Sequence, residues 1–380
     1  MHYYPQNPLH PASCADCAFL NECGGLDGDD FHKGCFSRCI THCAVRGCDM
    51  VCPVSALAFA DHVADVGGLW APQQTPLMAF DPSDLPPYVP QINHRGSRTV
   101  ALDEPWVTVP LYEIVGRDRK GRFGVRFDSP EQLRSALMVS RNTRIIVTSV
   151  TPDQVIEDFW EEHVVRSLVD KLARLGIAAM TVPNYSFMLE VSRINSLYNM
   201  SRSFRIAERL SEAGICTILH LNASTRKDWS RWADLLREQS HVSCVCVEFQ
   251  TGLKKKEFGE RYFANLVGLK DAIGRDLHPI ALAGTGRIVQ FQKSFPRFTV
   301  VDATPFMKTV HRQALVRVGQ RWKWLKKETP LNATLNQYLA TNIRNHRACQ
   351  LERAGLSPEG LGRQMLLPVG PAAKPHTVIS

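Results

Sequence analysis

Two runs of sequence decide the fold, CTILHL (Cys216–Leu221) and SCVCVEF (Ser243–Phe249). Both have the composition of buried strands, and the amphipathic segment Trp229–Gln239 lies between them. A strand, a helix and a second strand in this order are typical of a βαβ unit with parallel strands.

The same alternation extends in both directions along the chain. Further strand-like runs are Val125–Phe127, Ile145–Val150, Ala178–Val182, Pro279–Ala283 and Thr299–Val301, with Val107–Val115 as one more at the start. Helix-like segments are Val164–Leu175, Ser201–Ala213 and Lys256–Ile273. From Ile145 to Thr299 the strand starts advance about 31 residues per unit. The pattern predicts an α/β fold, a (β/α)8 TIM-type barrel, with a doubly wound open sheet as the alternative.

Composition divides the chain into four predicted zones. Residues 1–60 form a Cys-rich metal-binding module, and 61–97 form a Pro-rich connector. Residues 98–327 form the barrel, and 328–380 form a C-terminal helix and tail. No stretch approaches the roughly 18 apolar residues of a membrane span, and the start lacks the pattern of a signal peptide. These features predict a cytoplasmic protein without membrane contact, and they say nothing of its oligomeric state.

The cysteines are concentrated near the start of the chain. Eight of the twelve are Cys14, Cys17, Cys23, Cys35, Cys39, Cys43, Cys48 and Cys52. In a reducing compartment such a cluster favours metal binding over disulfides. Eight thiolates could fill two four-ligand sites for zinc or [4Fe–4S], and His32 or His42 could replace a cysteine in either site. The spacing leaves zinc and iron–sulfur open and predicts a structural role; the alternative is unrelated buried thiols.

Positive charge is also concentrated. The net charge is +8, and the stretch from Lys308 to Lys327 holds seven basic residues and no acidic one. The predicted nucleic-acid-binding residues in it are Arg312, Arg317, Arg321, Trp322, Lys323 and Lys326. Arginine and lysine bind phosphates and tryptophan can stack on bases; the alternative is a solvated helix face with its tryptophans in the core.

Polar residues at the predicted strand ends are the candidates for chemistry, because barrel enzymes place their sites there. Asp302 could stabilise an oxocarbenium-like centre, or it could cap the next helix. Glu248 could act as a general acid or base, or form a structural ion pair. His220 could handle a proton, or it could be an ordinary core histidine.

Substrate-binding candidates lie at the same ends. Asn184, Asn222 and Gln250 could read a base edge. Gly284, Gly286 and Arg287 could hold a phosphate or form a plain turn. Arg193, Asn199 and Arg202 could contact phosphates or a base, or form a solvated loop–helix junction.

A Cys-rich front, a Pro-rich connector and a barrel whose last strand gives Asp302-x-x-Pro305 resemble the tRNA-guanine transglycosylase superfamily. The likeness is to its divergent branch of DNA-acting and phage-defence proteins. That resemblance implies a TIM barrel that cleaves an N-glycosidic bond with carboxylates, and Asp302 as the nucleophile or cation stabiliser. The chain lacks the family's late Cys-x-Cys-x2-Cys zinc site and its Asp-Ser-Gly-Gly run. Base excision is therefore at least as expected as base exchange.

Together these features predict a base glycosylase that acts on DNA, which must take its base out of the stack. The DNA is expected to be modified and the setting to be anti-phage defence, with tRNA as the other possible substrate. Three alternatives stay open: a base-exchanging transglycosylase, an iron–sulfur oxidoreductase and a non-catalytic nucleic-acid-binding protein.

The cysteine cluster makes a testable prediction. Replacing Cys39 or Cys48 by Ser should impair folding, because metal-binding energy in such modules is folding energy. Elemental analysis of the purified protein should find zinc or iron. Less than one metal ion per chain would contradict the prediction.

Overall fold

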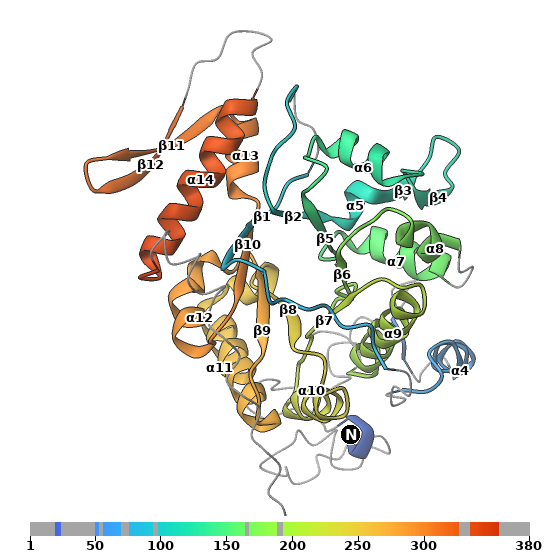
Figure 1. Ribbon diagram of the computed structural model, residues 1–380. Helices are drawn as coiled ribbons and strands as arrows, with labels where there is room; N and C mark the ends of the chain where they lie inside the picture. Colours follow the sequence, from blue (N-terminus) through green and yellow to red (C-terminus); the bar gives the residue numbers. More distant parts are fainter. Residues whose placement is uncertain are drawn as a thin grey trace, which may run out of the picture.

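The computed structural model describes residues 20–23, 50–52, 56–69, 76–93, 98–163, 167–187, 193–326 and 335–356. Within these ranges the central element is a parallel sheet of eight strands with helices outside it (Figure 1). In spatial order the strands are β1 (Tyr88–Pro90), β10 (Thr299–Asp302), β9 (His278–Leu282), β8 (Cys244–Glu248), β7 (Thr217–His220), β6 (Ala179–Thr181), β5 (Arg144–Thr148) and β2 (Trp106–Pro110).

The two edges of this sheet meet. Just beyond the end of β1, Gln91 forms a parallel bridge with Thr108 of β2. The amide of Ile92 donates a hydrogen bond of 2.9 Å to the carbonyl of Thr108. The sheet is therefore nearly closed, and the prediction of a TIM-like α/β barrel is confirmed at this level.

Helices follow most barrel strands and pack outside them. They are α5 (Leu111–Ile114), α6 (Pro130–Leu137), α7 (Asp153–His163), α8 (Ser167–Ala173), α9 (Arg193–Glu212), α10 (Arg226–Glu238), α11 (Lys256–Ile273), α12 (Ile288–Ser294), α13 (Thr304–Val310) and α14 (Asn336–Arg353). Two more precede the barrel, α2 (Leu20–Cys23) and α4 (Ala56–Asp65). Gly214 and Gly274 end α9 and α11 with φ of 79° and 67°, a conformation that favours glycine. No helix among the described residues is both long and apolar enough to cross a membrane.

The barrel interior is a separate hydrophobic cluster. Alternate strand residues fill it: Val89, Trp106, Ile146, Ala179, Ile218, Cys244, Cys246, Ile280, Leu282 and Val301. Phe80 and Leu85, which precede β1, belong to the same cluster. The Phe80 and Trp106 rings meet edge to face at 5.8 Å, so apolar groups fill the amino-terminal end of the barrel. The intervening strand residues, such as Val247 and Val300, face the helices instead.

Two predictions about strands were wrong. Val125–Phe127 supplies no barrel strand, because Phe123–Val125 (β4) pairs with Val115–Arg117 (β3) in an antiparallel hairpin. The first barrel strand is β1, which lies inside the predicted connector 61–97. Prolines surround β1, and proline normally argues against a central strand. Here their carbonyls contribute to the pairing, since Pro87 accepts a hydrogen bond from the Val300 amide.

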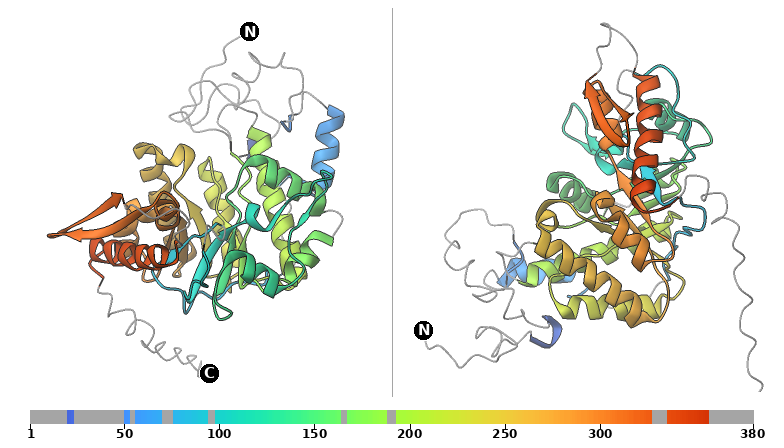
Figure 2. Two further views of the ribbon diagram at one scale, coloured as in Figure 1. Left: turned by 90° about the horizontal axis from the view of Figure 1, so that it is seen from above. Right: turned by 90° about the vertical axis from the view of Figure 1, so that its left-hand side faces the viewer.

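The part of the predicted barrel zone after α13 forms a second hairpin. Strands β11 (Gln313–Val318) and β12 (Arg321–Lys326) pair antiparallel and lie outside the barrel. The hairpin extends from the body beside α14, the C-terminal helix (Figures 1 and 2). Asn342 of α14 anchors it, because its side-chain oxygen accepts a hydrogen bond from the Leu315 amide at 2.8 Å.

Candidate active site

The barrel interior changes from apolar to polar toward the carboxyl ends of the strands. Five polar residues continue the inward-facing series there: Thr108, Thr148, Thr181, His220 and Glu248. Each stands two residues after an inward-facing apolar residue, so the alternation of strand side chains points it into the barrel. This polar layer occupies the edge at which barrel enzymes carry their sites.

Several buried polar atoms of this layer have no hydrogen-bond partner among the described residues. They are the Thr108 hydroxyl, both ring nitrogens of His220 and one carboxylate oxygen of Glu248. A buried polar group without a partner costs about 1–3 kcal/mol, so such groups normally meet water or a ligand. The polar layer therefore has unused hydrogen-bonding capacity directed into the barrel.

Glu248 is the only carboxylate in this layer of the described barrel. Burial raises the pKa of Glu248 above its ordinary 4.5, while a hydrogen bond from the Asn184 side chain opposes the shift. Asn184 in turn accepts a hydrogen bond from the Asn222 side-chain amide. The structure thus brings together three predicted residues from three neighbouring strands. A carboxyl group with a raised pKa can donate a proton nearer neutral pH than an exposed one.

His220 lies beside Glu248, one step deeper in the barrel. It pairs in register with Cys246, which is two residues before Glu248 on β8. The ring is only 1% exposed, and burial lowers its pKa to about 3. His220 is therefore a neutral ring that can donate through one nitrogen and accept through the other.

Asp302 does not join this group. It follows the outward-facing Val300 by two residues, and its carboxylate accepts hydrogen bonds from the Thr304 amide at 2.8 Å and the Thr304 hydroxyl at 2.6 Å. Its other oxygen lies 3.6 Å from Nε2 of His346 on α14. Asp302 therefore binds Thr304, the first residue of α13, and faces the C-terminal helix; the N-cap position itself is Ala303, so the alternative capping interpretation is met only in that Asp302 holds the start of the helix.

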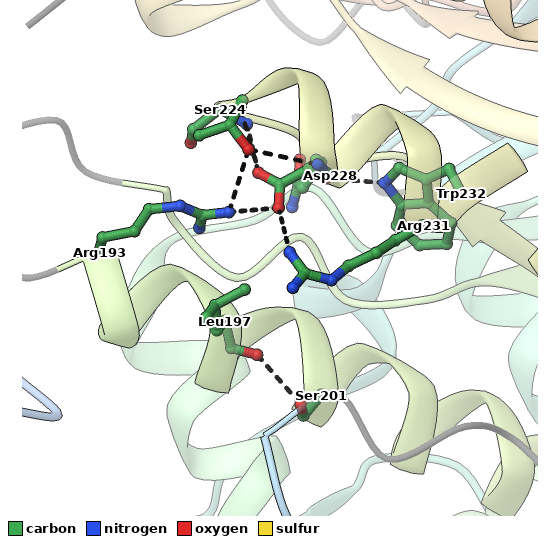
Figure 3. Close-up of polar contacts among 9 residues, drawn as sticks. Arg193, Leu197, Ser201, Ser224, Asp228, Arg231 and Trp232 are labelled. Carbon is green, nitrogen blue, oxygen red and sulfur yellow. Dashed lines mark hydrogen bonds and ion pairs between the residues drawn. The ribbon is translucent and has the colours of Figure 1, made fainter. Parts of the chain in front are cut away.

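Arg193 is also structural. Figure 3 shows Arg193 of α9 and Arg231 of α10 converging on Asp228, which is fully buried. The second oxygen of Asp228 accepts hydrogen bonds from the amides of Ser224 and Thr225 at 2.9 and 3.2 Å. The charge of Arg193 is thus used inside the protein, and phosphate contact by this residue is not supported.

The same network fixes the polar layer. Trp232, one residue after Arg231, donates its indole N–H to the Asn222 carbonyl at 2.8 Å. The hydroxyl of Tyr262 donates to the carbonyl of Leu221, the residue before Asn222. Helices α10 and α11 therefore both hold the segment that presents the Asn222 amide to Asn184.

Asn199 and Arg202 hold the loop after β6. Arg202 pairs with Glu157 and donates a hydrogen bond of 2.6 Å to the Asn199 side-chain oxygen. Its guanidinium lies 3.9 Å from the ring centroid of Tyr185. Asn199 donates to the Ser186 carbonyl at 2.8 Å. Both residues are buried in α9, so the alternative of a solvated junction is wrong; their contacts position the Asn184–Ser186 segment, and substrate binding by them stays a prediction.

The glycine pair forms a tight turn. A side chain at Gly284 would come within 2.5 Å of the Ala281 Cβ, whereas Gly286 has open space around it. Arg287 is bound to Glu260 at 2.9 Å and lies over the Phe249 ring. Gln250 follows β8 and is partly exposed, with its carbonyl bound to the Leu253 amide.

The structure divides the predicted basic patch between two faces of the β11–β12 hairpin. Trp322 donates its indole N–H to Glu352 of α14 at 3.0 Å, and Arg317 pairs with the same carboxylate at 3.1 Å. Arg321 and Lys323 are exposed on the other face. Arg312, with φ of 56°, and Lys326 are exposed at the base of the hairpin.

Most of the predicted metal ligands lie outside the described residues. These are Cys14, Cys17, Cys35, Cys39, Cys43 and Cys48, with His32 and His42. Cys23 ends α2, and Cys52 is partly buried. Among the described residues no three potential ligands cluster. The metal sites stay a prediction.

The threonines of the polar layer were missed because threonine is common in strands and carries no catalytic signal. Their signal is periodic, since Thr108, Thr148 and Thr181 each end an inward-facing series. Comparison with protein-family models finds no match, and no curated protein matches the chain. The resemblance to the transglycosylase superfamily therefore stays a prediction.

The Asp228 network predicts a large effect on stability. Replacing Asp228 by Asn leaves two buried guanidinium groups without their counter-ion and should lower the free energy of unfolding by about 3–5 kcal/mol. The control is Asp234→Asn on the same helix, which breaks an exposed pair with Arg237 and should cost at most about 1 kcal/mol. Urea denaturation measures both; equal losses would contradict the interpretation.

The buried histidines predict acid sensitivity. Burial lowers the pKa of His220 and of His278 to about 3, from an ordinary 6.5. Below pH 6.5 the unfolded chain binds protons that the folded chain cannot, so the folded state loses stability as the pH falls toward 3. The raised pKa of Glu248 acts with the opposite sign, since its contribution is lost as the pH rises.

Replacing His220 by Leu should therefore flatten the pH dependence of the unfolding free energy, by up to about 1.4 kcal/mol per pH unit. His278→Leu should act in the same direction, and the double variant should combine both effects. Denaturant titrations at several pH values measure the slopes. An unchanged slope in His220→Leu would show that the ring takes up protons in the folded state.

Proposed function

We propose that the protein releases a base from nucleic acid by hydrolysis of an N-glycosidic bond, with Glu248 as the proton carrier. The observation that carries the proposal is the polar layer at the carboxyl edge of the barrel. There, a partly buried acid with a raised pKa contacts the Asn184–Asn222 amide pair beside a neutral His220.

The proposed reaction needs one proton carrier. Protonated Glu248 donates its proton to the departing base nitrogen as the bond between that nitrogen and the sugar C1′ breaks. A water molecule then adds its oxygen to C1′, and the carboxylate takes up the proton that water releases. The products are a free base and an abasic sugar, and Glu248 returns to its starting state.

The amide pair and His220 supply recognition. A nucleobase presents donors and acceptors along one edge, and amides and a neutral imidazole match both kinds. The unused atoms of His220 and Thr108 lie below Glu248, on the inward side of the layer. This arrangement supports a substrate whose base leaves the stack and enters the barrel end, as enzymes that act on bases require.

Asp302 has a different place in this proposal than the resemblance implies. Its carboxylate is used by Thr304 and lies near His346, outside the polar layer. Glu248 takes the catalytic role, and Asp302 holds α13 and α14 at the end of the last strand.

The decisive test compares Glu248→Gln with Asp302→Asn at matched folded concentration. Glu248→Gln should lower the rate of base release about 10²–10⁴-fold, because the amide cannot donate or take up the proton. Asp302→Asn keeps an oxygen that can accept the hydrogen bonds from Thr304, and it should retain activity. Wild-type activity should also fall as the pH rises past the raised pKa of Glu248.

The substrates for this test are plain and modified phage DNA and tRNA, with released bases identified by mass spectrometry. An inactive Asp302→Asn beside an active Glu248→Gln would reverse the assignment. Absence of base release from all substrates by the wild type would reject the function. Incorporation of an added labelled base in place of the released one would identify base exchange.

A further inference from the structure

The β11–β12 hairpin is a two-stranded ribbon with one face on the body and one face in solvent. Its strands are joined by Gly319 and Gln320, and Gly319 has a φ of 60° that suits a tight turn. The base of the ribbon is buried at Ala314 and Leu315, whereas Arg317 through Arg321 are exposed. Both views in Figure 2 show the ribbon extending beside α14 at one side of the molecule.

On the inner face the charge of Arg317 is paired and the tryptophan rings are packed. Arg317 and the Trp322 indole both bind Glu352. The Trp324 ring lies 6.0 Å from the ring of His346 on α14. Base stacking needs exposed aromatic faces, so this arrangement does not favour a single strand as the partner.

The outer face carries free positive charge. The cross-strand pairs on it are Val318 with Arg321 and Val316 with Lys323. Both basic residues are exposed and have no acidic partner among the described residues. Val318 and Leu325, on the same face, are 46% and 39% exposed. An exposed basic face with short apolar side chains is complementary to a polyanion.

From these features we infer that the outer face of the ribbon docks on duplex DNA. The inference rests on the proposed function, which makes the substrate a nucleic acid. It adds that this substrate is double-stranded DNA. The major groove of B-form DNA, about 12 Å wide, admits a two-stranded ribbon. The major groove of an RNA duplex is too narrow and deep for side chains to enter.

The ribbon also follows directly from the carboxyl end of a barrel strand. Only α13 separates β10 from β11, and Asn342 of α14 binds both α13 and the base of the ribbon. The charged half of the ribbon lies beside Glu352, near the C-terminal end of α14, so a duplex on its outer face must extend from there to the polar layer for one base to leave the stack and reach the barrel.

The test uses the full chain with Arg321 and Lys323 both changed to Glu. The control changes Lys171 and Arg174 to Glu, which are exposed on or just after α8, on the opposite side of the molecule (Figure 1). Binding to a short labelled DNA duplex is measured by fluorescence anisotropy across a salt titration. The ribbon variant should bind roughly 10–100-fold more weakly. The slope of its log binding constant against log salt concentration should become shallower by about two. The control should match the wild type.

Equal effects of the ribbon and control variants would overturn the inference, as would tighter wild-type binding to duplex RNA or to single-stranded DNA. Base release, measured on the same proteins, separates the two proposals. Ribbon-dependent duplex binding without base release would reject the proposed function and keep the docking surface. Base release by the wild type, together with unchanged duplex binding by the ribbon variant, would keep the proposed function and reject the docking surface.

Discussion

In a closed sheet every strand residue faces either the barrel interior or the surrounding helices, and this alternation decides which polar side chains meet. Thr108, His220 and Glu248 share the inward parity, so they form one layer although they come from three strands. Asp302 stands at the end of β10 but has the outward parity. A single residue of offset thus separates a carboxylate aimed at the barrel interior from one that binds the first residue of a helix outside the barrel.

The polar layer is held in place by buried charged residues that pair with one another outside the layer. Asp228 neutralises Arg193 and Arg231, and the adjoining Trp232 fixes the Asn222 carbonyl. Buried ion pairs contribute little net stability compared with apolar packing, but losing one partner is costly. Their effect here is to fix one arrangement of α9, α10 and the segment after β7, which keeps the amide pair against Glu248.

The barrel, the helix α11 and most strand ends were predictable, because hydrophobic periodicity and glycine signals repeat in regular units. Strand β1 was not, because three residues among prolines carry no periodic signal. The grouping of Asn184, Asn222 and Glu248 could be predicted, because these residues stand at the ends of three successive predicted strands. The burial of Arg193, Asn199 and Arg202 did not, because a polar helix face is buried only when other helices supply partners such as Asp228 and Glu157.

The C-terminal helix joins the barrel to the ribbon. Nδ1 of His346 lies 3.2 Å from the Tyr88 hydroxyl of β1, and its Nε2 faces Asp302 of β10. Helix α14 therefore contacts two neighbouring strands through one side chain. Four residues earlier, Asn342 bonds Thr309 of α13 and the Leu315 amide of β11. Moving the ribbon would break these buried hydrogen bonds, each about 1–3 kcal/mol to leave unmade. A ribbon held in this way presents its charges at a fixed place relative to the barrel edge. Under the proposed function, the binding energy of a duplex on this ribbon would position a base rather than order the protein.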